Sequence, residues 1–144
     1  MNKNSRKTIL TSLVVLLLLV GGYFTFKNYN QPQVVLGDKN VEIIVVDRDK
    51  KPVYEKIINT DANLLGEVID QINADEKLFE LEGEKDSEFG RFITKVNLVE
   101  SIEGEFWVFD SENNKVCQTE AFCPGIDSLA IEDEDSFTFF LLEP

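Results

Sequence analysis

The sequence predicts an α+β fold, in which one helix packs on a mixed β-sheet, and three observations support this. Residues 41–46 form a short apolar run rich in β-branched side chains, which is typical of a strand covered on both faces. Residues 64–72 place their apolar side chains on one face of a helix. Residues 136–142 are again apolar on both faces, so we expect this last strand to lie parallel to the first at the sheet centre.

The first strand is expected to form a hairpin with the segment that follows it. Residues 47–52 are polar and end in Lys-Lys-Pro, as a turn requires. Residues 53–59 then bring a second run of β-type residues. Two such runs around a short polar segment are typical of paired antiparallel strands.

The helix is predicted from apolar residues that repeat at positions i, i+1, i+4, i+5 and i+8, namely Leu64, Leu65, Val68, Ile69 and Ile72. Because the first amides of a helix have no partner within it, a side-chain acceptor is expected just before the first turn. Asn63 and Asp61 are the two candidates for this cap.

The segment after the helix, residues 73–88, is acidic and without a regular pattern, although we expect Leu78, Phe79 and Leu81 to pack on the core. Further strands are predicted at residues 92–96, 106–109 and 136–142, separated by loops rich in Asn, Gly and Pro. The resulting order is β, β, α, β, β, β. A hairpin, a crossing helix and a last strand beside the first correspond to a β-grasp plan.

The N-terminal part of the chain predicts a membrane segment. The residues from Ile9 to Phe26 are uncharged and rich in Leu and Val, and they follow Lys3, Arg6 and Lys7. As a helix this run of 18 residues would be about 27 Å long, close to the thickness of a bilayer core. The basic residues are expected to remain cytoplasmic, which predicts a single-pass anchor with the rest of the chain extracellular.

A cleaved secretory signal is the alternative to this signal-anchor, and Gly21-Gly22 offers it only a poor cleavage site. Both interpretations predict export. We therefore divide the chain into a basic N-terminus with an anchor or signal segment (1–27), a polar linker (28–39) and one domain (40–144).

The charge is distributed unevenly along the chain. All 27 acidic residues follow residue 30, and residues 31–144 contain 10 of the 14 basic residues, which gives this part a net charge of −17. Such a surface repels the phosphates of nucleic acids and the headgroups of anionic lipids. We expect no nucleic acid partner, and the charge is typical of a soluble, exposed surface domain.

Five segments resemble, in order, the landmarks of the transcobalamin-like C-terminal β-grasp domain, which is found on exported proteins of Gram-positive bacteria. They are residues 63–69 (NLLGEVI), 90–97 (GRFITKVN), 105–109 (EFWVF), 125–131 (GIDSLAI) and 135–139 (DSFTF). The resemblance covers about residues 40–143. The chain departs from the family at Leu98, where glycine is usual, and at residues 132–135, which replace an Asp-Gly-Asp turn. Because Glu is less stable than Gly in a left-handed conformation, we expect that turn to be altered.

The resemblance implies a β-grasp module that faces a ligand or a partner; together with the apolar N-terminal run, it leads us to expect a membrane-anchored, non-catalytic binding module. In vertebrate cobalamin carriers such a domain closes over the corrin ring, so a corrinoid such as cobalamin is a possible ligand, alongside other small ligands. We expect no permanently bound cofactor. The alternative function is a cell-surface domain that interacts with another protein or with a wall polymer.

A flat apolar ligand would require aromatic side chains. Trp107 and Phe109 share one face of their predicted strand, and Phe106 and Val108 share the other. Phe122 lies in a loop between two cysteines. We therefore predict Trp107, Phe109 and Phe122 as ligand-binding residues; the alternative, which applies equally to Phe89 and Phe92, is that these rings fill or flank the core.

The two cysteines, Cys117 and Cys123, are the only ones in the chain and lie six residues apart. An even number of cysteines in an exported protein favours a disulfide, and closing so small a loop stabilises the fold by about 2 kcal/mol. A zinc site is not expected, because the chain contains no histidine, and the spacing is not that of a Cys-x-x-Cys redox motif.

Catalytic and metal sites are not predicted. The chain lacks histidine for a nucleophile-activating triad and lacks a glycine-rich phosphate loop. The acidic clusters at residues 47–49 and 132–135 do not have the glycine-containing bend of a calcium loop. We interpret both clusters as solvated turns.

Overall fold

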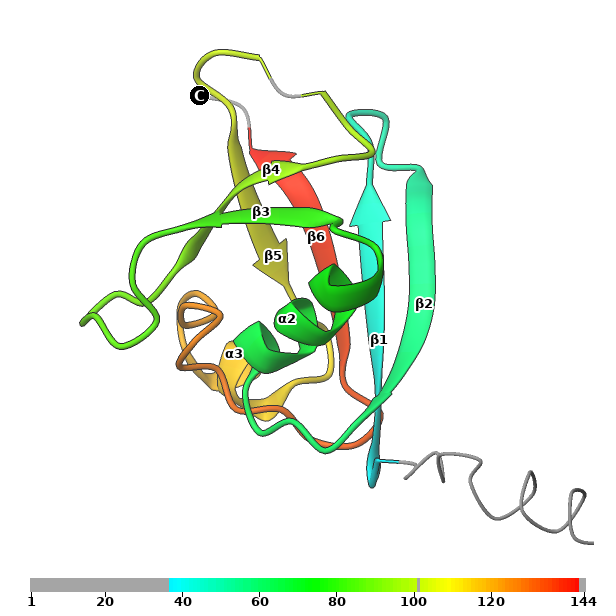
Figure 1. Cartoon of the computed structure of the whole chain (residues 1–144), viewed down its shortest axis with the longest axis vertical. Helices are drawn as coiled ribbons and strands as arrows, with labels where there is room; N and C mark the ends of the chain where they lie inside the picture. The colour runs from blue at the N-terminus through cyan, green and yellow to red at the C-terminus, as the bar shows by residue number, and fades with distance from the viewer. Residues whose placement is uncertain (1–36, 101, 143–144) are drawn as a thin grey trace, which may run out of the picture. The chain divides into compact units, whose positions relative to one another are not determined.

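The computed structural model describes residues 37–100 and 102–142. Figure 1 shows the helices and strands of these residues; the helices are numbered from α2 and the strands from β1. In chain order they are β1 (Lys39–Val46), β2 (Pro52–Thr60), α2 (Leu65–Asp75), β3 (Phe79–Glu82), β4 (Phe92–Val96), β5 (Phe106–Asp110), α3 (Lys115–Thr119) and β6 (Ser136–Leu142).

The main sheet contains four strands in the order β2-β1-β6-β5. Strand β1 is antiparallel to β2 and parallel to β6, and β5 is antiparallel to β6. The prediction that the last strand lies parallel to the first at the sheet centre is therefore confirmed. Strands β3 and β4 form a separate antiparallel pair.

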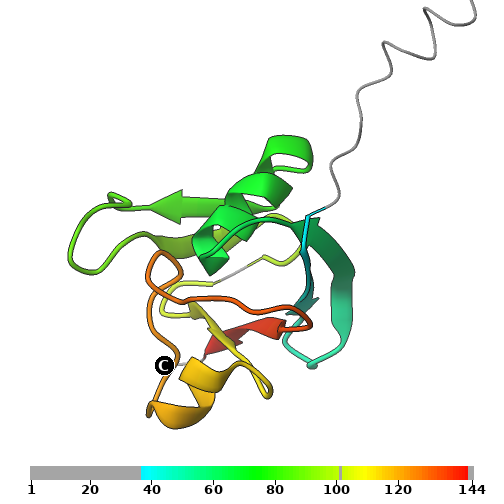
Figure 2. The ribbon, with the colours of Figure 1, turned by 90° about the horizontal axis from the view of Figure 1, so that it is seen from below.

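Helix α2 and the β3–β4 pair lie on the same side of the main sheet (Figures 1 and 2). The inward side chains of the two central strands, Val41, Ile43 and Val45 on β1 with Phe137 and Phe139 on β6, are fully buried. They pack with the apolar face of α2, whose fully buried side chains are Leu65, Val68 and Ile69. Burial of each such side chain stabilises the fold by about 1.5–3 kcal/mol. The helix and the hairpin thus enclose one core.

The helix begins differently from the sequence-based expectation. Its N-cap is Leu64, and neither Asn63 nor Asp61 caps it, so that prediction is wrong. The Glu67 carboxylate instead accepts hydrogen bonds from the backbone amides of Asn63 (2.8 Å) and Leu64 (3.2 Å), and these bonds lower the pKa of Glu67. The amides of Leu65 and Gly66 donate to backbone carbonyls in the 126–129 segment. A distant loop therefore supplies the acceptors that a local side chain was expected to supply.

Two elements were not predicted. Strand β3 lies within the segment that we expected to be irregular, and pairs with β4 from Phe79 opposite Val96 to Glu82 opposite Phe92. Helix α3 occupies the start of the cysteine loop. The expected packing of the segment after α2 is confirmed, because Leu78 and Phe79 are buried and Leu81 is half-buried against the core.

The turn before β6, for which the sequence predicted an altered conformation, contains one residue in the left-handed region. Glu134 adopts a φ of 67°. Its backbone N–H donates to the Asn40 carbonyl, and its carbonyl accepts from the Asn113 side chain. These two hydrogen bonds of the Glu134 backbone hold the turn, although a glutamate occupies a position that favours glycine. The altered turn stays a prediction.

The predicted membrane segment from Ile9 to Phe26 lies outside the described residues, as does most of the linker. Within residues 37–100 and 102–142, no helix is long and apolar enough to cross a membrane.

Candidate functional site

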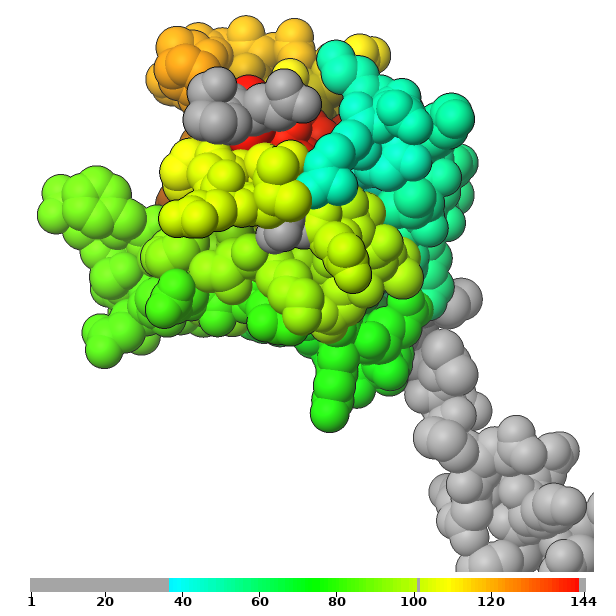
Figure 3. Space-filling view, turned by 90° about the horizontal axis from the view of Figure 1, so that it is seen from above, coloured from blue at the N-terminus to red at the C-terminus, as the bar shows by residue number. Residues whose placement is uncertain are grey.

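A pocket of about 650 Å³ lies where β4, β5, the end of β6 and the disulfide loop come together. In the described part of the chain β5 pairs only with β6, so β5 forms one edge of the main sheet. In Figure 3 the surface is indented between the projecting β3–β4 loop (green) and the segment that contains α3 (orange). Six of the residues that line the pocket are aromatic: Phe89, Phe92, Trp107, Phe109, Phe122 and Phe140.

The pocket wall on β5 combines core packing with an unused polar group. The Trp107 side chain is only 7% exposed, and its Nε1 has no hydrogen-bond partner among the described residues. The half-buried Phe109 ring contacts Phe137 and Phe139 at centroid distances of 6.3 and 5.5 Å. Phe109 thus belongs to the core on one side and borders the pocket on the other.

The rim of the pocket is formed by aromatic rings that the fold leaves in solvent. Phe89 is 83% exposed, Phe122 is 86% exposed and Phe92 is 57% exposed. Scattered apolar residues are common on protein surfaces, but several large rings around one cavity are typical of a binding site.

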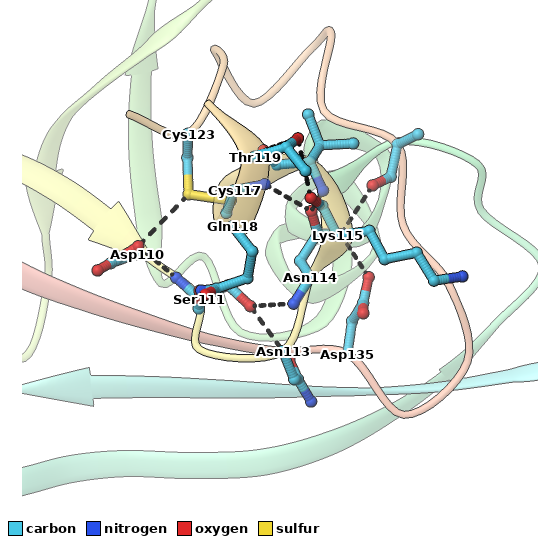
Figure 4. Close-up of a disulfide and its surroundings, with 12 residues drawn as sticks. Asp110, Ser111, Asn113, Asn114, Lys115, Cys117, Gln118, Thr119, Cys123 and Asp135 are labelled. Carbon is cyan, nitrogen blue, oxygen red and sulfur yellow. Dashed lines mark hydrogen bonds between the residues drawn. A yellow bond between two sulfur atoms is a disulfide. The ribbon is translucent and has the colours of Figure 1, made fainter. Parts of the chain in front are cut away.

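The disulfide predicted between Cys117 and Cys123 is confirmed, with a Cα–Cα distance of 4.4 Å. Both cysteines line the pocket, and the short loop that they close carries Phe122. The disulfide holds this loop beside the end of β5, where Asp110 lies (Figure 4). It therefore restricts where the Phe122 ring can go.

Buried Asn114 fixes the start of the same loop (Figure 4). Its side-chain oxygen accepts from the amides of Val116 and Cys117, which caps α3. Its side-chain nitrogen donates to Asp135 Oδ2 at 2.6 Å and to the Ala130 carbonyl at 3.0 Å. One asparagine thus connects the cysteine loop to the turn that leads into β6.

Arg91 also lines the pocket, and its charge is paired with two carboxylates. Its Nε and NH2 donate to the two oxygens of Asp127 at 2.9 and 2.7 Å, and its NH1 donates to Asp70 at 2.7 Å. The guanidinium lowers the pKa of both Asp127 and Asp70 through these hydrogen bonds. The group joins α2, the start of β4 and the 126–129 segment.

The three predicted ligand-binding residues, Trp107, Phe109 and Phe122, all line this one pocket, although they come from two separate segments. Their role in binding stays a prediction. Phe89 and Phe92, which were expected to pack, also line the pocket, as do Arg91 and Asp110, whose place there was not predicted. The signal for Phe89 was its position in a polar, acidic segment, where a large apolar side chain has little core to join.

The residues of the described segments do not fit a metal centre. Within 37–100 and 102–142, no group of three or more Cys, Asp or Glu side chains could hold a metal ion.

Comparisons with known proteins give structural matches alone. No family model matches the chain, and no curated protein matches it. A crystallised protein from Ruminococcus gnavus ATCC 29149, described as a "putative metal binding protein", is similar with a TM-score of 0.56 and 25% identity, over 74% of this chain and 99% of that one.

Haptocorrin, crystallised in complex with Cbi, is similar with a TM-score of 0.50 and 12% identity. The match covers 73% of this chain but 25% of haptocorrin, so the present chain corresponds to about a quarter of that protein. At this level of identity the likeness concerns the fold alone.

Proposed function

We propose that this domain binds a flat, largely apolar small ligand of the corrinoid type in the pocket beside β5, without acting on it chemically. The observation that carries the proposal is the ring of aromatic side chains around the pocket, above all the exposed Phe89 and Phe122. The volume of about 650 Å³ falls within the range of small-molecule sites.

The fold supports the corrinoid class in particular. We propose that the domain belongs to the transcobalamin-like β-grasp group, and its order β2-β1-β6-β5 with parallel β1 and β6 supports this. The similarity to haptocorrin, which was crystallised with Cbi, agrees with this assignment. Metal binding is not carried over from the Ruminococcus gnavus protein, because the described residues offer no metal-ligating cluster.

The affinity is expected to be modest. Covering an exposed phenylalanine ring contributes up to about 1.5–3 kcal/mol, but association itself costs several kcal/mol in lost freedom. Phe89 and Phe122 are both more than four-fifths exposed, so the fold itself shields little of either ring around a bound ligand. We expect a Kd on the order of 100 μM for this domain alone.

Titration of the full-length chain with cobinamide tests the proposal. Trp107 is the one tryptophan in the sequence and lines the pocket, so its fluorescence reports on this site. We expect saturable quenching with a matching change in the corrinoid absorption spectrum. Replacing Phe122 with alanine should weaken binding by about 3-fold to 10-fold, because one ring contact is lost.

The matched control is Ile57→Ala, which removes an apolar side chain that is 65% exposed on β2 and does not line the pocket. This variant should bind like the wild type. Absence of a saturable spectral change up to about 1 mM, ten times the expected Kd, would contradict the proposal.

We further propose that the domain is displayed outside the cytoplasm on an N-terminal membrane anchor. The apolar run from Ile9 to Phe26 and the disulfide support this, because disulfides persist mainly in oxidising compartments. Fractionation of cells should recover the chain in the membrane fraction, with both cysteines in the disulfide and no titratable thiol. A cytosolic full-length chain with two titratable thiols would refute it.

A second candidate function uses the same surface. Rings as exposed as Phe89 and Phe122 also serve as anchors for protein partners, so a surface protein could dock on them. Cross-linking from a reactive group at position 88, beside Phe89, should then capture a specific envelope protein. A cross-linking pattern that Phe89→Ala leaves unchanged would exclude this function.

A further inference from the structure

We infer that the pocket prefers ligands with a positively charged group and rejects anionic ligands of the same shape. This inference rests on the proposed function, because it specifies the ligand class of the same site. It follows from the charges that line the pocket and from the chemistry of its walls.

The positive charge in the wall is already neutralised. Arg91 is the one basic residue among those lining the pocket, and it donates to the paired oxygens of both Asp127 and Asp70. Its side chain is largely buried, and that of Asp127 is almost fully buried. An anionic ligand would have to displace one of these carboxylates to reach the guanidinium. Lys85 also pairs with Asp70, at 3.3 Å, so the two basic and two acidic side chains of this cluster sum to no net charge.

The negative charge in the wall has no such partner. Asp110 lines the pocket at the end of β5, is exposed, and forms no ion pair with any described residue. Its Oδ1 accepts from the Ser111 amide. The nearby Cys123 sulfur, at 3.7 Å, belongs to the disulfide and has no hydrogen to donate. The carboxylate is therefore available to a ligand cation.

The aromatic walls favour the same charge. The faces of aromatic rings are negative, and a cation within about 6 Å of a ring centre is attracted to them. Phe89, Phe92 and Phe122 present exposed rings around the pocket. The net charge of −17 on residues 31–144 adds a long-range negative potential, which also attracts a cation. A ligand with an apolar plane and an ammonium group satisfies all three features.

Three naphthalene probes of matched shape test this: 2-naphthylmethylammonium, 2-naphthalenemethanol and 2-naphthoate. Their retention by the full-length chain in a non-ionic detergent is measured by equilibrium dialysis, and detergent alone corrects for partition. At about 50 mM salt the cation is expected to bind roughly tenfold more tightly than the anion, with the alcohol between them. The difference should shrink at about 0.5 M salt.

Asp110→Asn should reduce the ratio of cation to anion affinity to about threefold, because the local carboxylate is removed. Asp49→Asn changes the net charge equally in an exposed turn outside the pocket and should leave the ratio unchanged. Equal retention of the three probes, or stronger retention of the naphthoate, would overturn this inference alone. Failure to retain any probe while cobinamide still binds would also overturn this inference, whereas the proposed function falls only if cobinamide does not bind.

Discussion

At the scale of single residues, a few side chains hold the segments that shape the pocket. Arg91 ties three segments together through Asp70 and Asp127, and Asn114 ties the cysteine loop to the turn before β6. These contacts join residues that are far apart in the sequence, so pattern alone could not reveal them. Two of the residue-level features lead to measurable effects on stability.

The first effect concerns the pH dependence of folding. Arg91 lowers the pKa of Asp127 in the folded state. The ion pair therefore contributes fully to the free energy of unfolding at a pH above the unfolded-state pKa of about 3.9. This contribution to stability is lost as the pH falls through the lower pKa that Asp127 has in the folded state. Asp127→Asn should therefore cost about 2 kcal/mol at pH 7 and flatten the fall in stability below about pH 4.

Urea unfolding of the wild type and the variant between pH 2 and pH 7 measures this. Asp70→Asn is the comparison, since Asp70 also pairs with Arg91 but has a side chain that is 41% exposed. It should cost less than Asp127→Asn, because solvent screens the pair. Equal losses in the two variants would contradict the role assigned to the buried carboxylate.

The second effect concerns the backbone at Glu134, which has a φ of 67°. Glycine adopts this conformation without a steric penalty, and the hydrogen bonds of this residue involve its backbone alone. Glu134→Gly should therefore stabilise the domain by about 0.5–1 kcal/mol in chemical denaturation. Glu134→Ala removes the same carboxylate but keeps Cβ, and it should give no such gain. Equal stability of the two variants would argue against backbone strain.

At the scale of elements, apolar patterns predicted the hairpin β1–β2, helix α2 and the parallel pairing of β6 with β1. These features depend on which face of an element is apolar, and the sequence shows that directly. Strand β3 and helix α3 were missed because they are short and gain their stability from tertiary contacts. The cap of α2 was wrongly predicted for the same reason, since the first amides of the helix donate to carbonyls of the 126–129 segment.

The cysteine loop gives the prediction that belongs to this scale. Reduction of the disulfide between Cys117 and Cys123 should lower the free energy of unfolding by about 2 kcal/mol. It should also weaken cobinamide binding, because Phe122 is then less restricted. Thermal unfolding and the fluorescence titration, each with and without reductant, measure the two effects.

The double variant Cys117→Ser/Cys123→Ser is the control for reduction. The chain contains no other cysteine, so this variant should behave like the reduced protein and should ignore the reductant. A reductant effect of the same size on the variant would show that the change does not arise from this disulfide.

At the scale of the whole molecule, the fold places β5 at one of the two edges of the main sheet and brings the aromatic rings of several segments beside it. The sequence identified Trp107, Phe109 and Phe122 as candidates because a flat apolar ligand requires aromatic side chains, on a strand or in the loop between the cysteines. It could not show that Phe89 and Phe92 border the same cavity. Which ring finds a place in the core depends on contacts across the fold rather than on neighbours in the chain.

The central claim is that a flat ligand binds beside β5, and the indole N–H signal of Trp107 tests it most directly. This signal is unique, because the chain has one tryptophan, and the buried Nε1 lacks a partner among the described residues. On addition of cobinamide to the ¹⁵N-labelled full-length chain, we predict saturable shifts of the indole signal and of the Phe122 and Cys123 amides, with the Ile57 amide unchanged. An unshifted indole signal, or shifts confined to β2, would contradict the account.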